Sequence, residues 1–193
     1  YALGAIKNVG YEAISNIVNE RENNGEYKNL SDFIKRVDPK DINKLQLEGL
    51  VRAGAFDNLN ENRQSIYNSI PNIILKSKNH FENKQANQFD LFDDKLSNEE
   101  NILEEIEDWN IDVRLTNEFE TLGFYISDHP LNQYKSIFDQ YNIVSYDKFL
   151  SDENLLSSNI ACTILKTQEK KTQKGTSYAI IKFSDLNSVF ELF

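Results

Sequence analysis

The chain has 193 residues and a formal net charge of −10, with 39% hydrophobic and 27% charged residues. This hydrophobic fraction is low for one compact globule, so we expect one or two small domains and a part that does not pack. The single cysteine, Cys162, excludes a disulfide within the chain and fits a reducing cytoplasm. The sequence has neither an apolar run long enough to span a membrane nor a signal-peptide pattern, so we expect no membrane partner.

The acidic charge is concentrated in the middle of the chain. Residues 82–128 hold 3 basic and 14 acidic side chains, whereas residues 1–81 hold 11 and 10 and residues 129–193 hold 7 and 7. Because net charge speaks to solubility and not to local sites, it does not exclude a nucleic-acid partner. The chain starts with tyrosine and stops inside a strand-like pattern, so we expect a fragment of a longer protein.

Helical spacing marks the N-terminal region. Ile14 and Ile17 share a helix face, and Gly25 is placed to end that helix. Ser31 is a predicted N-cap for a short helix that ends near Val37.

The next helix has the clearest start signal in the sequence. Asp38 is a good N-cap and Pro39 suits the first helical position, while Gly54 follows the last apolar turn. After a tight turn, Asn60 or Asn62 starts another helix, which Pro71 should kink or split in two.

The C-terminal region changes to a period of two. Residues 160–165, 178–183 and 188–193 are predicted strands, and residues 166–176 form a lysine-rich hairpin between the first two. Strand, basic hairpin, strand and third strand are typical of the start of a small oligonucleotide-binding (OB) barrel.

Two segments predict short helical hairpins, at Ile6–Ile14 and Leu50–Asp57. Such hairpins aim free backbone N–H groups at a phosphate, and the next helix adds its positive end. The alternative is that their glycines only separate helices. The residues expected to contact DNA phosphates are Lys7, Asn8, Val9, Gly10, Arg52, Gly54, Ala55 and Arg63.

We therefore predict an α+β multidomain fragment. An all-α tandem helix-hairpin-helix DNA-binding domain spans residues 1–80, and an acidic flexible linker spans residues 81–108. A helical connecting segment covers residues 109–150, and a partial OB-type β-barrel covers residues 151–193.

Longer motifs give a specific resemblance. The segments Tyr1–Gly10 (YALGAIKNVG), Leu47–Asp57 (LEGLVRAGAFD) and Glu118–Leu131 resemble, in the same order, blocks of the alpha subunit of bacterial DNA polymerase III. That family often has glycine where this chain has Asn8, so the second hairpin is the firmer prediction, although asparagine tolerates a left-handed backbone. The resemblance implies a part of a DNA-directed DNA polymerase, a nucleotidyltransferase of DNA replication, whose catalytic aspartates and Mg²⁺ lie in a palm domain upstream.

The middle segment contains the pentapeptide QFDLF, which is similar to the motif by which bacterial proteins bind the sliding clamp. An apolar pair in an acidic linker has no core of its own to enter, so it is a predicted anchor for a groove on the clamp, the polymerase beta subunit. The alternative is that the segment folds back on its own domain. The residues expected to bind the clamp are Gln88, Asp90, Leu91 and Phe92.

The lysine-rich hairpin is a second possible nucleic-acid contact. Lys170, Lys171 and Lys174 can follow a single-stranded DNA backbone while Tyr178 stacks on a base, as the family's OB module implies. A hairpin that is lysine-rich only for solubility is the equal alternative.

No catalytic, metal or cofactor site is predicted. His80 and His129 are far apart in sequence, and neither zinc spacing nor a glycine-rich phosphate loop is present. The expected partners are duplex DNA and the sliding clamp, with single-stranded DNA and other replisome subunits after them. The alternative functions are a free-standing helix-hairpin-helix accessory protein of repair or recombination and a hydrolase that uses the acidic cluster.

Overall fold

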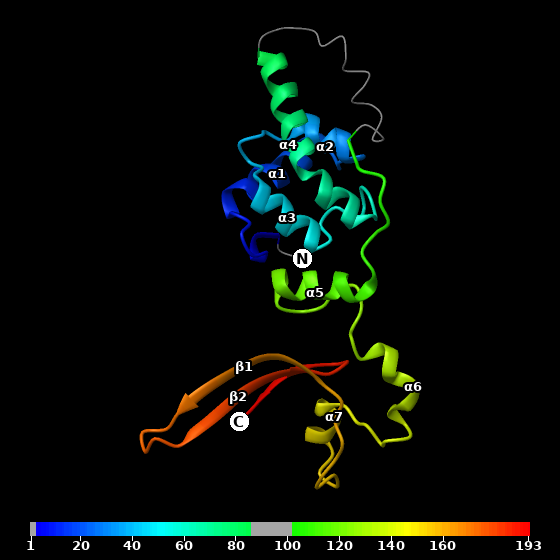
Figure 1. The fold of residues 1–193 in the computed structure, drawn as a ribbon, viewed down its shortest axis with the longest axis vertical. Helices are drawn as coiled ribbons and strands as arrows, with labels where there is room; N and C mark the ends of the chain where they lie inside the picture. The colour runs from blue at the N-terminus through cyan, green and yellow to red at the C-terminus, as the bar shows by residue number, and fades with distance from the viewer. Residues whose placement is uncertain (1–2, 86–101) are drawn as a thin grey trace. The chain divides into compact units, whose positions relative to one another are not determined.

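The computed structural model describes residues 3–85 and 102–193. The chain divides into two compact units, residues 1–124 (unit 1) and residues 125–193 (unit 2) (Figure 1). The described part of unit 1 is helical, and unit 2 combines short helices with an antiparallel sheet, which confirms the α+β class. The division at residue 124 differs from the predicted boundaries at residues 80, 108 and 150. None of the described helices is long and apolar enough to cross a membrane.

The first long helix forms as its apolar spacing predicts. After the short helix η1 (Leu3–Ala5), α1 (Tyr11–Asn24) buries Ile14 and Ile17. It ends at Gly25, whose φ of 86° lies in the region that favours glycine.

The second helix begins earlier than predicted. In α2 (Leu30–Arg36) the N-cap is Asn29, whose side chain accepts a hydrogen bond of 2.8 Å from the backbone N–H of Asp32. Ser31, the predicted N-cap, is buried inside the helix.

The third helix, α3 (Lys44–Arg52), begins later than Asp38 and Pro39 predict. Asn43 and Gln46 form a capping box, in which each side chain accepts from the other residue's backbone N–H at 2.9 Å. This box provides acceptors for two backbone N–H groups at the helix start. The Asp38 side chain instead accepts from the Lys40 N–H inside a turn.

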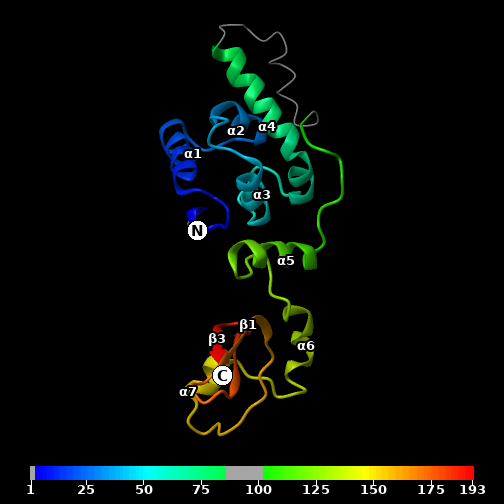
Figure 2. The ribbon, with the colours of Figure 1, turned by 60° about the vertical axis from the view of Figure 1, so that its left-hand side comes forward.

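The longest helix is α4 (Arg63–Gln85), and its N-cap Asn62 is one of the two predicted starts. The prediction that Pro71 splits it is wrong, because the helix continues through that residue as one element. Ile66, Ile70 and Ile73 lie in the core of unit 1, where α4 contacts both α2 and α3 (Figure 2).

The predicted linker over residues 81–108 is wrong at both described ends. Its first residues, 81–85, belong to α4. After the undescribed residues, Ile102 is 1% exposed in the core, and its carbonyl accepts a hydrogen bond of 2.9 Å from the Asn72 side chain. The segment 102–108 therefore returns to α4 and packs along it.

The helix α5 (Ile111–Leu122) also belongs to unit 1, although it was predicted as a connecting segment. Asn110 caps its start, and Gly123 ends it with a left-handed φ of 81°. It contacts α3, so unit 1 is built from two stretches of chain that residues 86–101 join.

Unit 2 begins with η4 (Asn132–Tyr134), α6 (Lys135–Phe138) and α7 (Tyr146–Ser151). Its sheet has the order β1-β2-β3, and both strand pairs are antiparallel. The three strands are β1 (Thr163–Lys171), β2 (Ser177–Ser184) and β3 (Val189–Leu192).

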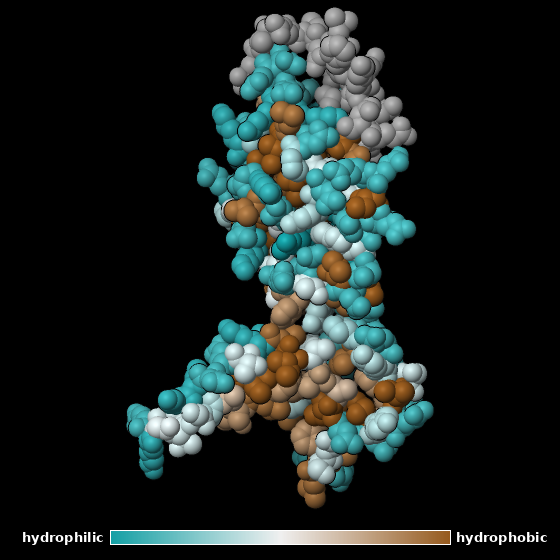
Figure 3. All heavy atoms as spheres, viewed as in Figure 1, coloured by the Kyte–Doolittle hydropathy of each residue, from teal (hydrophilic) through white to brown (hydrophobic). Residues whose placement is uncertain are grey.

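The sheet of unit 2 has three strands, as predicted, but β1 begins later than the predicted strand over residues 160–165 and is longer. It continues through Lys171, so most of the predicted lysine-rich loop is strand. Phe183 lies opposite Phe190, whose ring stacks on Tyr146 of α7 with centroids 3.9 Å apart. On the visible face of unit 2, apolar side chains gather near this end of the sheet, whereas the hairpin tip is hydrophilic (Figure 3).

Candidate nucleic-acid interface

The first hairpin, Ile6–Gly10, joins η1 to α1 by a tight turn. Asn8 has a φ of 66°, so the left-handed backbone predicted for this position is confirmed. Ile6 and Val9 enter the core, and the Val9 N–H donates to the Ile6 carbonyl at 3.2 Å. The buried pair fixes the turn, while Lys7 and Asn8 remain exposed between its two anchors.

Backbone donors are available at this first hairpin. The Lys7 N–H donates to the Thr121 carbonyl at 3.2 Å, but within the described residues the N–H groups of Asn8 and Gly10 have no acceptor. Gly10 is the N-cap of α1 and offers no side-chain cap. Two N–H groups without an acceptor therefore lie just before a 14-residue helix, whose positive end attracts an anion.

The second hairpin, Arg52–Asp57, turns at Gly54 with a φ of 74°. Two of its amides are already used, because the Gly54 N–H donates to Val51 at 3.0 Å and the Ala55 N–H donates to Leu50 at 2.9 Å. The N–H groups of Gly54 and Ala55 are therefore paired inside the hairpin. Within the described residues the Phe56 N–H has no acceptor, but only the free donors of the first hairpin lie directly before a long helix.

Arg63 was predicted as a phosphate contact, but its side chain is only 2% exposed and is a structural residue. Its guanidinium donates to both carboxylate oxygens of Asp57, at 2.8 and 2.7 Å, and to the fully buried Glu118 at 2.8 Å. A Cβ on Gly54 would lie 2.3 Å from this guanidinium, so glycine is required where the turn crosses it.

The pKa of Arg63 shows how this buried group is kept charged. Burial lowers the pKa, but the hydrogen bonds that Arg63 donates to Asp57 and Glu118, together with the negative charges of these carboxylates, more than offset it, so the pKa lies above its usual range. Because Glu118 lies on α5, the second hairpin is held in place by a helix that begins 54 residues after Asp57. No local pattern in the sequence signals this pair.

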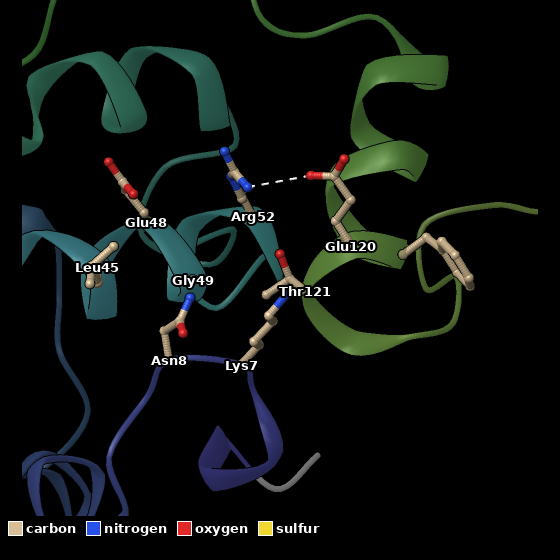
Figure 4. A pocket seen from close by; sticks show the side chains of 9 residues that line it. Lys7, Asn8, Leu45, Glu48, Gly49, Arg52, Glu120 and Thr121 are labelled. Carbon is tan, nitrogen blue, oxygen red and sulfur yellow. Dashed lines mark hydrogen bonds and ion pairs between the residues drawn. The ribbon is translucent and has the colours of Figure 1, made fainter. Parts of the chain in front are cut away.

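A groove of about 480 Å³ lies beside the first hairpin (Figure 4). It is formed by the hairpin, by α3 and by the last turn of α5, all within unit 1. We call it the hairpin groove, and its lining residues are Lys7, Asn8, Leu45, Glu48, Gly49, Arg52, Phe119, Glu120 and Thr121.

Arg52 is the cation that crosses the hairpin groove. One terminal nitrogen, Nη2, donates to the Tyr67 hydroxyl at 3.0 Å, and the guanidinium carbon lies 5.3 Å from the centre of that ring. The other, Nη1, lies 3.5 Å from the Glu120 carboxylate. The side chain is 32% exposed, so Arg52 is held in position and still open to solvent, as a phosphate contact must be.

Gly49 is a residue of this site that the sequence prediction missed. It is buried in α3, and a Cβ there would lie 2.9 Å from the Lys7 backbone carbonyl. The first hairpin therefore packs directly on the α3 backbone. A glycine alone inside a helical pattern is the signal that identifies such a close approach.

The other predicted contacts have different outcomes. The clamp-binding residues Gln88, Asp90, Leu91 and Phe92 lie outside the described residues. In unit 2, Lys170 lies opposite Tyr178 in the sheet, Lys171 lies opposite Ser177, and Lys174 is in the turn that follows. Over the described ranges, no group of three or more His, Cys, Asp and Glu side chains is placed to hold a metal ion.

Two helical hairpins packed in one unit, with free amides at a turn before a helix, form a helix-hairpin-helix arrangement. Residues 1–66 match the family model described as a helix-hairpin-helix motif. Over its whole length, the chain is homologous to one region of the bacterial DNA polymerase III alpha subunit.

Three relatives illustrate this homology, and each is a DNA polymerase III subunit alpha. The chain is 34% identical over 197 residues to that of Rickettsia prowazekii, 30% over 194 residues to that of Caulobacter vibrioides, and 32% over 197 residues to that of Campylobacter jejuni. The matches cover 99–100% of this chain but only 16–17% of each relative. The chain thus spans about a sixth of the length of these subunits.

Proposed function

We propose that this chain is a duplex-binding part of a DNA-directed DNA polymerase and contacts DNA through backbone phosphates. The observation that carries the proposal is that, among the described residues, the N–H groups of Asn8 and Gly10 just before α1 have no acceptor. A phosphate oxygen accepts such hydrogen bonds well, because its charge also interacts favourably with the helix end. These contacts read the backbone and not the bases, so binding is independent of sequence.

The hairpin groove supports the same function. Lys7 and Arg52 line it, and both can reach a phosphate next to the one at the first hairpin. The second hairpin supports the site from within, since the amides of Gly54 and Ala55 are paired and Arg63 is buried beneath it. Homology over the whole chain favours this function over a free-standing repair or recombination protein.

Two substitutions of Gly10 test the amide contact. The residue has a φ of −72°, so both alanine and proline fit its backbone, and a Cβ would lie 3.6 Å from Gln46, an ordinary contact. Alanine keeps the N–H and proline removes it. Gly10→Pro should bind a labelled duplex about tenfold more weakly, the worth of one charge-assisted hydrogen bond, and Gly10→Ala should bind like the parent chain.

The affinity is measured by fluorescence anisotropy at several salt concentrations, after the thermal midpoint has shown that both variants are folded. The affinity of the parent chain should fall steeply with salt, because phosphate contacts release counterions from DNA. Equal affinities for Gly10→Ala and Gly10→Pro, or an affinity that salt does not change, would show that the first hairpin does not bind phosphate.

We further propose that QFDLF docks on the sliding clamp, which the sequence motif alone supports. We also propose that the sheet of unit 2 begins an OB barrel that binds single-stranded DNA. The three antiparallel strands support this assignment, as does the placement of Lys170 directly opposite the half-exposed Tyr178, where a charge and a ring face one strand of nucleic acid.

A further inference from the structure

An ion pair spans the hairpin groove from α3 to α5. Arg52 Nη1 and Glu120 Oε2 are 3.5 Å apart, with side chains 32% and 59% exposed (Figure 4). Exposed pairs of this length contribute about 0–1 kcal/mol, so the pair opens easily. Glu120 is therefore an exchangeable partner for Arg52.

The position of Glu120 is fixed by the backbone of α5. The next residue, Thr121, is buried, and its carbonyl accepts the hydrogen bond of 3.2 Å from the Lys7 N–H. The last turn of α5 is thus attached to the first hairpin. Only the side chain of Glu120 can leave the groove, while its Cα stays beside Arg52.

The groove is close to neutral when nothing is bound. Lys7 and Arg52 are opposed by Glu48 and Glu120, and Glu48 is also 3.8 Å from Lys44 on the same helix. Glu120 is therefore the carboxylate that an anion approaching Arg52 meets. A phosphate that reaches this guanidinium replaces the carboxylate, because both groups are anions whose oxygen atoms accept hydrogen bonds from arginine.

We propose that Glu120 occupies the place of a backbone phosphate on Arg52 and so sets the affinity of the hairpin groove for DNA. This proposal rests on the function proposed above, since it requires that DNA enters the groove. When a phosphate binds, the carboxylate turns into solvent but stays close, and the remaining repulsion keeps the affinity moderate. Moderate affinity suits a contact that must move along DNA without reading its sequence.

The substitution Glu120→Gln tests this directly, because glutamine keeps the size of the side chain and removes its charge. A matched control is Glu105→Gln, which makes the same change of net charge at an exposed position away from the groove. We expect Glu120→Gln to bind a random-sequence duplex about three- to tenfold more tightly at low salt, with little change for the control. The difference between them should shrink as salt rises, because ions screen the repulsion.

A double-mutant cycle identifies the partner. In an Arg52→Gln background, Glu120→Gln should have no more effect than Glu105→Gln, because the guanidinium for which the carboxylate and the phosphate compete is gone. Equal affinities for Glu120→Gln and Glu105→Gln in the parent chain, or weaker binding by Glu120→Gln, would overturn the proposal. If either result is found while Gly10→Pro binds duplex DNA more weakly than Gly10→Ala, only the role of Glu120 is wrong. If Gly10→Pro binds like Gly10→Ala, the proposed function itself is wrong.

Discussion

At the scale of single residues, the site depends on positions where a side chain would be too large. Gly49 brings the α3 backbone against the Lys7 carbonyl, and Gly54 lets the second turn cross the Arg63 guanidinium. Both glycines therefore have a packing role as well as a place near a helix end. The first hairpin keeps its shape because backbone lies on backbone, and the second because its backbone lies directly on the Arg63 side chain.

The substitution Gly49→Ala should destabilise unit 1. A Cβ 2.9 Å from the Lys7 carbonyl and 3.2 Å from Val9 must push the hairpin away, at a cost of about 1–3 kcal/mol. The better helix propensity of alanine offsets about 1 kcal/mol of that. We expect a net loss of up to about 2 kcal/mol and a lower thermal midpoint, measured by the fluorescence of Trp109, the single tryptophan, which lies in unit 1.

Asn19→Ala on α1 is the control for helix propensity, since this residue is exposed in the middle of a helix. It should leave the midpoint unchanged or raise it slightly. A Gly49→Ala chain as stable as that control would mean that the hairpin does not pack on α3 as described.

At the scale of elements, local sequence signals identified most helices and strands. Apolar spacing found α1, a start signal at Asn62 found α4, and alternation found all three strands. The start of α3 was misplaced because Asp38–Pro39 and Asn43–Gln46 are both good start signals. The helix begins at the second signal, because each of its two side chains accepts a hydrogen bond from the backbone N–H of the other residue. Spacing alone cannot choose between two such caps.

The site was only partly predictable, because tertiary contacts decide which of its charged residues are exposed and which are buried. Arg52 and Arg63 look alike in sequence, yet one lines the groove and the other is buried. The difference lies in Glu118, which follows Arg63 by 55 residues. A local pattern cannot show a pairing over that distance, and the segment 102–108 was read as a linker for the same reason.

Glu118→Gln should therefore destabilise unit 1 strongly. It leaves Arg63 buried with one charged partner fewer, and breaking a buried pair in this way costs about 3–5 kcal/mol. The denaturant midpoint of Trp109 fluorescence is the measurement. The double variant Arg63→Met with Glu118→Leu should recover most of the loss, because an apolar pair needs no partner charge.

Glu120→Gln is the control on the same helix. Its side chain is 59% exposed, so the free energy of unfolding should change by less than about 0.5 kcal/mol. If Glu118→Gln were as mild as this control, α5 would not hold the second hairpin. The two glutamates thus separate a stabilising role of α5 from its effect on affinity.

At the scale of the whole molecule, both ends of the segment that holds QFDLF are attached to unit 1. The helix α4 ends at Gln85, and Ile102 is in the core, so the described residues on either side of QFDLF both belong to unit 1. A clamp contact in this segment would be tethered to the DNA contact through a short length of chain. Two weak contacts on one tether bind together far more tightly than either alone, because the second forms at a high effective concentration.

The double substitution Leu91→Ala with Phe92→Ala should abolish binding to the isolated sliding clamp and leave duplex binding intact. The two side chains contribute about 1.5–3 kcal/mol each when buried, and they account for most of the binding free energy of so short a peptide. Leu96→Ala is the matched control, since it shortens an apolar side chain of the same segment outside the motif. Co-elution with the clamp on a sizing column separates the outcomes. If the double variant still co-elutes, QFDLF is not the anchor. A second measurement uses a duplex that carries the clamp. If the double variant no longer binds the isolated clamp but binds this duplex as tightly as the parent chain does, the two contacts do not act through one tether.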